Sequence, residues 1–177
     1  MKRIVFYMSL ILVFLSFVSC EADERDVNVT PKVYMPQAAY GDSYIVPNNG
    51  TDVQMNKNYD IDSVNNKLNI YLGVYRSGLG ELKAFSVDVH AGSIAIPSTT
   101  LLPVSDYTLP TKVSVEVGKR EAYFYLTVNL DFLKNNRTMN FSLPVTITNL
   151  SFYDFNDKLT TTKVYIKTSE ILDKENL

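Results

Sequence analysis

From residue 67 onward, apolar and polar side chains alternate with a period of two. Successive side chains of a β-strand point to opposite faces of a sheet, so this period predicts strands with one buried and one solvated face. The pattern recurs in six segments, which are residues 67–76, 85–90, 113–117, 122–130, 141–148 and 163–167. Before them, a first strand pair is expected within residues 27–35, where Pro31 interrupts the ladder.

Turn-forming residues separate these segments. Residues 37–66 are polar and rich in Gly, Pro and Asn, which predicts a long loop with short strands near 43–46 and 52–55. Pro144 lies inside a strand pattern and indicates an edge strand or a bulge, because proline cannot donate to a ladder. Residues 131–137 could form a short helical turn or a loop.

The number and spacing of these segments indicate the fold class. About seven to eight short strands joined by frequent turns are typical of a β-sandwich or a small barrel. The sequence therefore predicts one all-β domain over residues 30–168, followed by a charged tail over residues 169–177. The chain has one cysteine and no tryptophan, so an immunoglobulin-like label would describe its architecture only.

The first nineteen residues follow a different pattern. Lys2 and Arg3 precede an apolar run over residues 4–18 that only two serines interrupt. This run is shorter than the roughly 20 residues that a membrane-spanning helix needs, and its basic start is typical of a signal peptide. Residues 1–19 are therefore predicted to be a cleaved leader, with an uncleaved anchor or an ordinary secretory signal as the alternatives.

Cys20 follows this leader directly after Ser19. A small residue and then a cysteine at the end of an apolar leader resemble the lipobox of bacterial lipoproteins, although Phe17 stands where that motif usually has leucine. The resemblance implies cleavage before Cys20 and lipidation of its thiol and new amino group. Cys20 is the only cysteine and can form no internal disulfide, which agrees with this role. Each buried acyl methylene contributes about 0.8 kcal/mol, so two or more chains make the membrane attachment stable.

The residues after Cys20 are strongly acidic. Residues 21–26 carry four carboxylates, and such a segment cannot pack into a core, so residues 20–29 are predicted to be a solvated tether. The stretch resembles the acidic signal of surface-exported Bacteroidota lipoproteins, which implies an outer-membrane, surface-exposed location. Loss of the leader changes the formal charge from −2 to about −4, and no basic block suggests a nucleic-acid partner.

Three motifs of the domain resemble a known family. They are LLPVSDYTLP at residues 101–110, VSVEVG at 113–118 and FSLPVTI at 141–147. They are similar to the immunoglobulin-like N-terminal domain of unknown function in many Bacteroidota surface lipoproteins, which often belong to polysaccharide-utilisation systems. The resemblance covers about residues 30–168 and implies an immunoglobulin-like β-sandwich with a role in glycan capture. A lectin-like or glycoside-hydrolase module commonly follows this domain, and no such activity is expected from the present residues.

The sequence predicts no catalytic residues, metal or cofactor. His90 is the only histidine, no Gly-x-Ser-x-Gly motif accompanies it, and a position at the surface end of a strand accounts for it. Residues 58–62 have the oxygen spacing of a calcium loop, but Ser63 stands where that loop needs glycine and Asn69 where it needs glutamate, so a polar loop is preferred. Paired carboxylates could hydrolyse glycosides, yet no pair can be inferred by spacing among 19 acidic residues.

Tyrosines are the strongest candidates for ligand binding. Five lie on the polar side of their predicted strands: Tyr71, Tyr75, Tyr123, Tyr125 and Tyr165. If these strands share one sheet, the rings would form an exposed platform for sugar rings, and large exposed aromatic patches usually mark interaction sites. The alternative is cross-strand pairing, which stabilises a sheet by a few tenths to about 1 kcal/mol per pair. Tyr40, Tyr44 and Tyr59 in the long loop are a second candidate platform.

These observations predict a lipid-anchored, non-enzymatic surface protein that assists glycan capture or utilisation. The alternative is a structural or adaptor module that docks other outer-membrane or adhesin components. A tyrosine cluster on one open face would favour glycan binding, whereas a flat apolar patch or an exposed edge strand would favour a protein partner. Asp62, Ser63 and Val64 resemble a short bacterial O-glycosylation sequon and are a candidate modification site.

Overall fold

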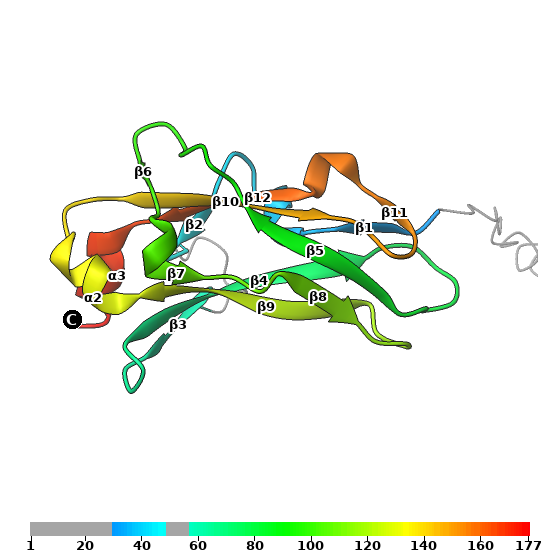
Figure 1. Cartoon of the computed structure of the whole chain (residues 1–177), viewed down its shortest axis with the longest axis horizontal. Helices are drawn as coiled ribbons and strands as arrows, with labels where there is room; N and C mark the ends of the chain where they lie inside the picture. The colour runs from blue at the N-terminus through cyan, green and yellow to red at the C-terminus, as the bar shows by residue number, and fades with distance from the viewer. Residues whose placement is uncertain (1–29, 49–56) are drawn as a thin grey trace, which may run out of the picture.

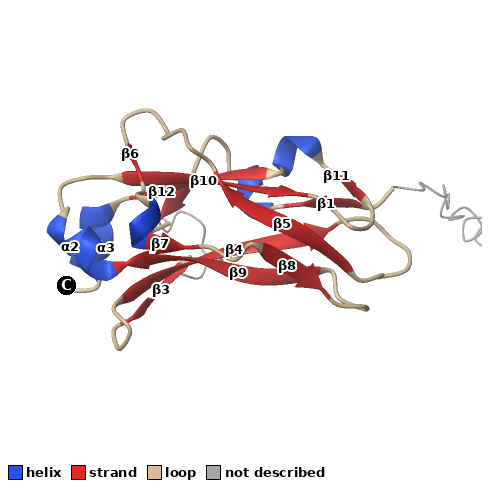
Figure 2. Cartoon of the chain, in the orientation of Figure 1, coloured by secondary structure: helices blue, strands red, loops and turns tan. Residues whose placement is uncertain are grey.

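The computed structural model describes residues 30–48 and 57–177, which form an all-β domain of two six-stranded sheets (Figures 1 and 2). The strands of this described part are β1 (Lys32–Tyr34), β2 (Tyr44–Val46), β3 (Tyr59–Asp62), β4 (Lys67–Arg76), β5 (Phe85–Ala91), β6 (Thr100–Leu101), β7 (Tyr107–Thr108), β8 (Lys112–Val115), β9 (Glu121–Asn129), β10 (Phe141–Thr148), β11 (Asp154–Phe155) and β12 (Thr161–Ile166). The predicted leader, Cys20, the acidic tether and the strands expected near 27–29 and 52–55 lie outside the described residues.

The two sheets have different strand orders. Sheet A has the order β11-β1-β4-β9-β7, and β3 pairs with β4 on the same side as β1. Sheet B has the order β2-β12-β10-β5-β8, and β6 adds to β10. The longest ladder joins β4 to β9 and runs from the pair Lys67–Asn129 to the pair Tyr75–Glu121. This ladder is visible along the lower part of Figure 1, where β4 and β9 run side by side.

The side chains of the core are those at the apolar positions of the alternating pattern, as the sequence predicted. The apolar positions of each long strand point inward: Leu68, Ile70, Leu72 and Val74 of β4 meet residues of β10 such as Leu143 and Val145 in one buried cluster. Burial of a large aliphatic side chain contributes about 1.5–3 kcal/mol, so this shared cluster is what holds the sheets together. The polar positions of the same strands are consequently left on the two outer faces.

The predicted strand number is wrong because the shortest strands carry no readable period. Seven strands of the described chain have four or more residues, and the other five have two or three. A period of two cannot be recognised in two residues, so β6, β7 and β11 depend on hydrogen bonds to neighbouring strands. The strand expected near residues 43–46 is confirmed as β2.

The expected edge position of Pro144 is also wrong. Its strand, β10, pairs with β12 on one side and with β5 and β6 on the other. Within β10, Phe141 and Ser142 pair with β6, and residues 145–148 pair with β5. Pro144 lies in the gap between these two groups. In that gap the Pro144 carbonyl accepts a 2.7 Å hydrogen bond from the Gly92 amide, so no donor is needed from residue 144.

The charged tail expected over residues 169–177 is instead part of the domain. Helix α3 (Thr168–Lys174) buries Ile171 and Leu172 completely and contacts α2 (Leu130–Asn135). Figure 1 shows both helices at one end of the molecule, beside the C-terminus. The two buried residues are adjacent in a mainly charged segment, so no helical period revealed them. In the described part of the chain, every helix is too short or too polar to cross a membrane.

Candidate functional site

Strand pairing gathers four of the five predicted tyrosines on the outer face of sheet A. In the β4–β9 ladder Tyr71 lies opposite Tyr125, and Gly73 lies opposite Tyr123. Directly opposite residues of an antiparallel pair share a face, so these rings project to the same side. Tyr75 also points outward and lies opposite Tyr34 of β1, a residue that the sequence analysis did not select. The five rings, Tyr34, Tyr71, Tyr75, Tyr123 and Tyr125, are called the tyrosine platform below.

Two ring contacts fix the ends of the platform. The ring centroids of Tyr71 and Tyr125 are 5.3 Å apart, with an angle of 57° between the ring planes. Those of Tyr34 and Tyr75 are 5.4 Å apart at 60°. Tilted aromatic pairs at such distances contribute about 0.5–1.5 kcal/mol beyond the burial of their area, so the platform is preorganised before any ligand arrives.

Tyr123 lies between these two pairs, over a position that has no side chain. A Cβ atom at Gly73 would be 3.3 Å from Cδ1 of Tyr123, so the ring leans over Gly73 and occupies the space that a larger residue would fill. Tyr123 nevertheless remains 65% exposed, and Tyr125 remains 48% exposed. The two side chains therefore offer large ring surfaces to a ligand on this face.

The remaining tyrosine candidates do not join the platform. Tyr165 lies on β12 in sheet B, and its hydroxyl accepts a 3.1 Å hydrogen bond from the Asn140 amide. Of the second predicted platform, Tyr44 and Tyr59 are 7% and 2% exposed and belong to the core. That second platform is wrong, because both side chains fall on the inward side of their short strands. Tyr40 alone of the three is exposed.

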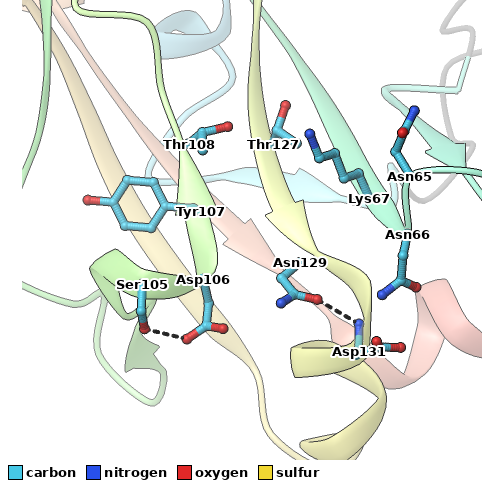
Figure 3. Close-up of a pocket in the computed structure, with 10 residues that line it drawn as sticks. All are labelled: Asn65, Asn66, Lys67, Ser105, Asp106, Tyr107, Thr108, Thr127, Asn129 and Asp131. Atoms are coloured by element: carbon cyan, nitrogen blue, oxygen red, sulfur yellow. Dashed lines mark hydrogen bonds between the residues drawn. The ribbon is translucent and has the colours of Figure 1, made fainter.

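A polar pocket of about 260 Å³ lies on sheet A toward the α2 end of the molecule (Figure 3). It is built from the turn between β3 and β4, the start of β4, the segment through β7, the end of β9 and the start of α2. Its lining residues are Asn65, Asn66, Lys67, Ser105, Asp106, Tyr107, Thr108, Thr127, Asn129 and Asp131. Amide, hydroxyl and charged groups from five segments therefore converge on one space.

Hydrogen bonds within the polar pocket orient several of these groups. The Oδ1 atom of Asn129 caps α2 by accepting bonds from the amides of Asp131 at 3.0 Å and Phe132 at 3.4 Å. The Nδ2 atom of Asn129 has no hydrogen-bond partner among the described residues and is available as a donor. The Ser105 hydroxyl donates to the Asp106 carboxylate at 2.8 Å. Figure 3 shows Asn129 at the end of β9, between Asp131 at the start of α2 and the segment that carries Ser105 and Asp106.

A groove of about 480 Å³ shares lining residues with both the polar pocket and the tyrosine platform. It is lined by Thr108, Leu109, Pro110, Phe124, Tyr125 and Thr127. Thr108 and Thr127 also line the polar pocket, and Tyr125 also belongs to the platform. An extended ligand could therefore pass from the rings to the polar groups without leaving the surface of β9.

The phenol groups of Tyr71 and Tyr123 remain neutral donors at physiological pH. A hydrogen bond to Glu121 and partial burial raise the pKa of Tyr123 above its ordinary value. Partial burial raises the pKa of Tyr71, and the nearby carboxylate of Asp60 adds to this effect. A higher pKa keeps the hydroxyl protonated, so both groups can donate as well as accept hydrogen bonds.

The other sequence candidates lie outside this site or at its rim. His90 is exposed on the outer side of β5. Asn58 is buried and committed to the backbone, since its amide donates to the Ile45 carbonyl at 2.7 Å and its oxygen accepts from Asn48 at 3.1 Å. Ser63 of the candidate glycosylation sequon is exposed in the turn between β3 and β4. Within the described residues, no group of three or more His, Cys, Asp or Glu side chains is placed to hold a metal ion.

Sequence reasoning missed Tyr34 and the whole polar pocket. For Tyr34 a signal existed, because Val33 and Met35 are apolar neighbours that place Tyr34 on the opposite, outward side of a strand. For the polar pocket no local signal existed. Asn65 and Asp106 are 41 positions apart, and ordinary turn chemistry accounts for each of them separately.

Comparisons with known proteins find partial similarity only. No family model matches the sequence, and no curated protein matches it. A candidate carbohydrate-binding protein from Bacteroides ovatus ATCC 8483 has 14% sequence identity and a TM-score of 0.47, over 76% of this chain and 36% of that one. A Bacteroides ovatus protein of unknown function has 16% identity and a TM-score of 0.43, over 56% of this chain and 36% of that one. The chain thus spans 36% of the length of each, and we infer its function from the geometry of its own site.

Proposed function

We propose that this protein binds a polysaccharide along the outer face of sheet A and has no enzymatic activity. The observation that carries the proposal is the continuity of the tyrosine platform, the groove and the polar pocket through Tyr125 and Thr127. A pyranose ring has an apolar face of C–H groups and a rim of hydroxyls. The platform suits the face, and the uncharged amides and hydroxyls of the polar pocket suit the rim.

The experiment is affinity electrophoresis of the chain without its leader and cysteine, residues 21–177, through gels that contain single polysaccharides from plant and host sources. We expect retardation by at least one of them. A Tyr71→Ala/Tyr123→Ala variant should lose it, because each substitution removes a ring from the platform. The matched control is Tyr165→Ala, which removes a tyrosine from the opposite sheet and should leave retardation unchanged.

Two results would contradict this proposal. One is the absence of retardation across a broad panel. The other is an equal loss of retardation in the Tyr71→Ala/Tyr123→Ala and Tyr165→Ala proteins, when circular dichroism reports that both variants are folded like the wild type. The first result would exclude direct capture, and the second would move the site away from sheet A.

The second candidate function is a docking module, and the edge of β9 favours it. Strand β7 pairs only with Thr127 and Val128, so among the described residues the segment 121–126 of β9 has a strand neighbour on one side only. An open edge can accept a strand from another protein. Crosslinking in intact cells, with a photoreactive residue at Glu121, which is exposed in this segment, would capture such a partner. A clean crosslinked product without any polysaccharide binding would favour docking.

We propose further that the domain is anchored at the outer surface of the outer membrane through lipid on Cys20. The apolar leader, the single cysteine and the acidic residues 21–26 support this. Growth with an alkyne-bearing fatty acid should label the wild-type protein, and Cys20→Ala should remove the label. Protease added to intact cells should digest the domain. Protection in intact cells, with digestion after lysis, would place the domain in the periplasm instead.

We also propose that the architecture is immunoglobulin-like. In that fold one sheet has the order A-B-E-D and the other contains C-F-G. The run β1-β4-β9-β7 of sheet A and the run β5-β10-β12 of sheet B support this assignment, because each strand then keeps the expected neighbours. The short β7 precedes β8 rather than following it, which is a departure from the variable-type order. A crystal structure in which β4 and β9 lie in different sheets would refute the assignment.

A further inference from the structure

The charges around the proposed polysaccharide site are mainly negative. Four carboxylates project from its strands or rim and are in no ion pair with the described residues: Asp60, Asp106, Glu121 and Asp131. Asp60 lies opposite Asn69 on the outer face, and Glu121 lies opposite Tyr75 at the other end of the platform. Asp106 and Asp131 line the polar pocket. Negative charge thus occurs at both ends of the path that a polysaccharide would follow.

The cations described on this face do not balance these carboxylates. Lys32 and Lys57 are held in ion pairs, Lys32 with Asp154 at 3.3 Å and Lys57 with Glu175. Lys67 lines the polar pocket and is in no ion pair with the described residues, and Asp62 lies opposite it on β3 with its carboxylate hydrogen-bonded to Asn65. One cation with a carboxylate on the neighbouring strand is a weak attractor for an anionic ligand.

We propose that this site selects uncharged polysaccharides and disfavours acidic ones that carry uronate, sulfate or phosphate groups. The inference rests on the proposed polysaccharide binding and adds the class of ligand. A carboxylate entering the polar pocket would meet Asp106 and Asp131, and among the described lining residues Lys67 alone is a cation that could offset them. Like charges in a partly desolvated site repel each other. Neutral hydroxyls can instead accept from Asn129 and donate to the same two carboxylates.

The first test compares neutral with acidic polysaccharides in the electrophoresis assay on residues 21–177. Starch, xylan, galactan, laminarin and mannan form the neutral set. Polygalacturonate, alginate, hyaluronan and chondroitin sulfate form the acidic set. We expect the strongest neutral ligand to retard the protein at a concentration at least tenfold below that of any acidic one.

The possible outcomes distinguish the selection of neutral polysaccharides from polysaccharide binding itself. Retardation by an acidic polysaccharide that equals or exceeds the best neutral one would overturn the selection and leave polysaccharide binding in place. No retardation by any polysaccharide would overturn both. A tenfold or greater preference for a neutral one would support both.

The second test changes charge on a single ligand. Oxidation of the primary alcohols of the best neutral hexose polysaccharide to carboxylates gives a matched acidic form. We expect it to bind at least tenfold more weakly at low salt, and the difference should shrink as ionic strength rises, because the Debye length falls to roughly 3 Å at 1 M salt. A difference that does not change with salt would show that the lost alcohols, and not charge, cause the effect, and would overturn the inference.

Substitutions locate the repulsion on the protein. In Asp106→Asn/Asp131→Asn the ratio of the affinity for the neutral polysaccharide to the affinity for its oxidised form should fall several-fold. The asparagine amides keep the shape of the side chains and remove their charge. Asp88→Asn is the matched control, since Asp88 lies on the outer face of sheet B. An unchanged ratio in the double variant, or an equal change in the control, would overturn the role of the polar pocket in selection.

Discussion

The outer faces of the two sheets come from strands with the same alternating pattern, yet they differ in what they expose. On sheet A the outward positions of β4 and β9 carry tyrosines, two of which, Tyr123 and Tyr125, are exposed. On sheet B the outward positions include small hydroxyl and charged residues that pair with each other. Thr146 and Thr161 share a 2.9 Å hydrogen bond, and Asp88 faces Lys112 at 3.8 Å.

This difference shows that the alternation of apolar and polar residues does not distinguish two kinds of outer face. In one kind the polar groups are already paired with each other, and in the other the side chains are available to a ligand. Polar groups on sheet B satisfy one another across strands, so they gain little from a ligand. On sheet A the rings keep large areas in water, and their burial under a ligand would be favourable by about 25 cal/mol for each Å² of apolar surface. The four predictions below test this contrast, beginning with the largest expected effect.

Leu126 and Thr127 are neighbours on β9 that point to opposite faces, so they compare the core side of sheet A with its outer side. Leu126→Ala should lower the free energy of unfolding by about 3 kcal/mol, because Leu126 is fully buried and the substitution leaves a cavity. Thr127→Ala should cost about 1 kcal/mol or less, since it removes one hydrogen bond to Asn69. Urea denaturation measures both values. Similar losses in the two variants would contradict the assignment of faces.

Buried and exposed tyrosines should differ at alkaline pH. Burial raises the pKa of Tyr44 to about 12, above its unfolded value of about 10. The folded state then holds the proton more tightly, so this contribution is complete below about pH 10 and is lost as pH rises through the folded pKa. Wild-type stability should fall by roughly 1 kcal/mol more per pH unit than that of Tyr44→Phe between about pH 10 and 12. Parallel pH dependences in urea titrations would exclude this role for Tyr44.

The C-terminal segment links the two sheets, and Glu175 tests that link. Its carboxylate accepts a 2.7 Å hydrogen bond from Tyr59 of β3 and pairs with Lys57, while α3 continues from β12 of sheet B. The hydrogen bond from Lys57, then that from Tyr59, lowers the pKa of Glu175. Its stabilisation is therefore present above the unfolded pKa and is lost as pH falls through the folded one.

Glu175→Gln should consequently lower the free energy of unfolding by about 1 kcal/mol at neutral pH. The difference from wild type should shrink as pH falls below the unfolded pKa of about 4.3 and vanish only below the lowered folded pKa, where the carboxyl group is protonated in both folded and unfolded chains. Urea titrations of both proteins at several pH values would measure it. A difference that persists undiminished in acid would mean that the contribution is not electrostatic.

The smallest expected change in stability comes from Gly73→Ala on the tyrosine platform. A Cβ atom there would meet the ring of Tyr123 at 3.3 Å, so the ring must shift by a few tenths of an ångström. We expect a stability change within about 0.5 kcal/mol but a several-fold loss of polysaccharide retardation, because the ring surface is displaced. Unchanged retardation would mean that the position of Tyr123 does not matter for binding. Gly118→Ala is unsuitable as a control, because Gly118 has a φ of +80°.

The alternation of side chains predicted the long strands and four of the five platform rings because both depend on local geometry. Tyr71 and Tyr123 point outward for the same reason that Leu72 and Phe124 point inward. Short strands such as β7 escaped prediction because their order comes from hydrogen bonds to β9 rather than from their own sequence. Helix α3 escaped because two adjacent apolar residues carry no helical period.

The sequence by itself determined the all-β class, the division of each long strand into a core side and a solvent side, and a set of outward-pointing tyrosines. These follow from a period that is fixed by the geometry of a single strand. Only the tertiary structure decided which strands share a sheet, and with it that Tyr34 joins the platform and Tyr165 does not. It also decided that Asn65, Asp106 and Asn129 surround one pocket. Pairing between distant segments is set by the shared core and by backbone hydrogen bonds across it, and a linear pattern contains neither.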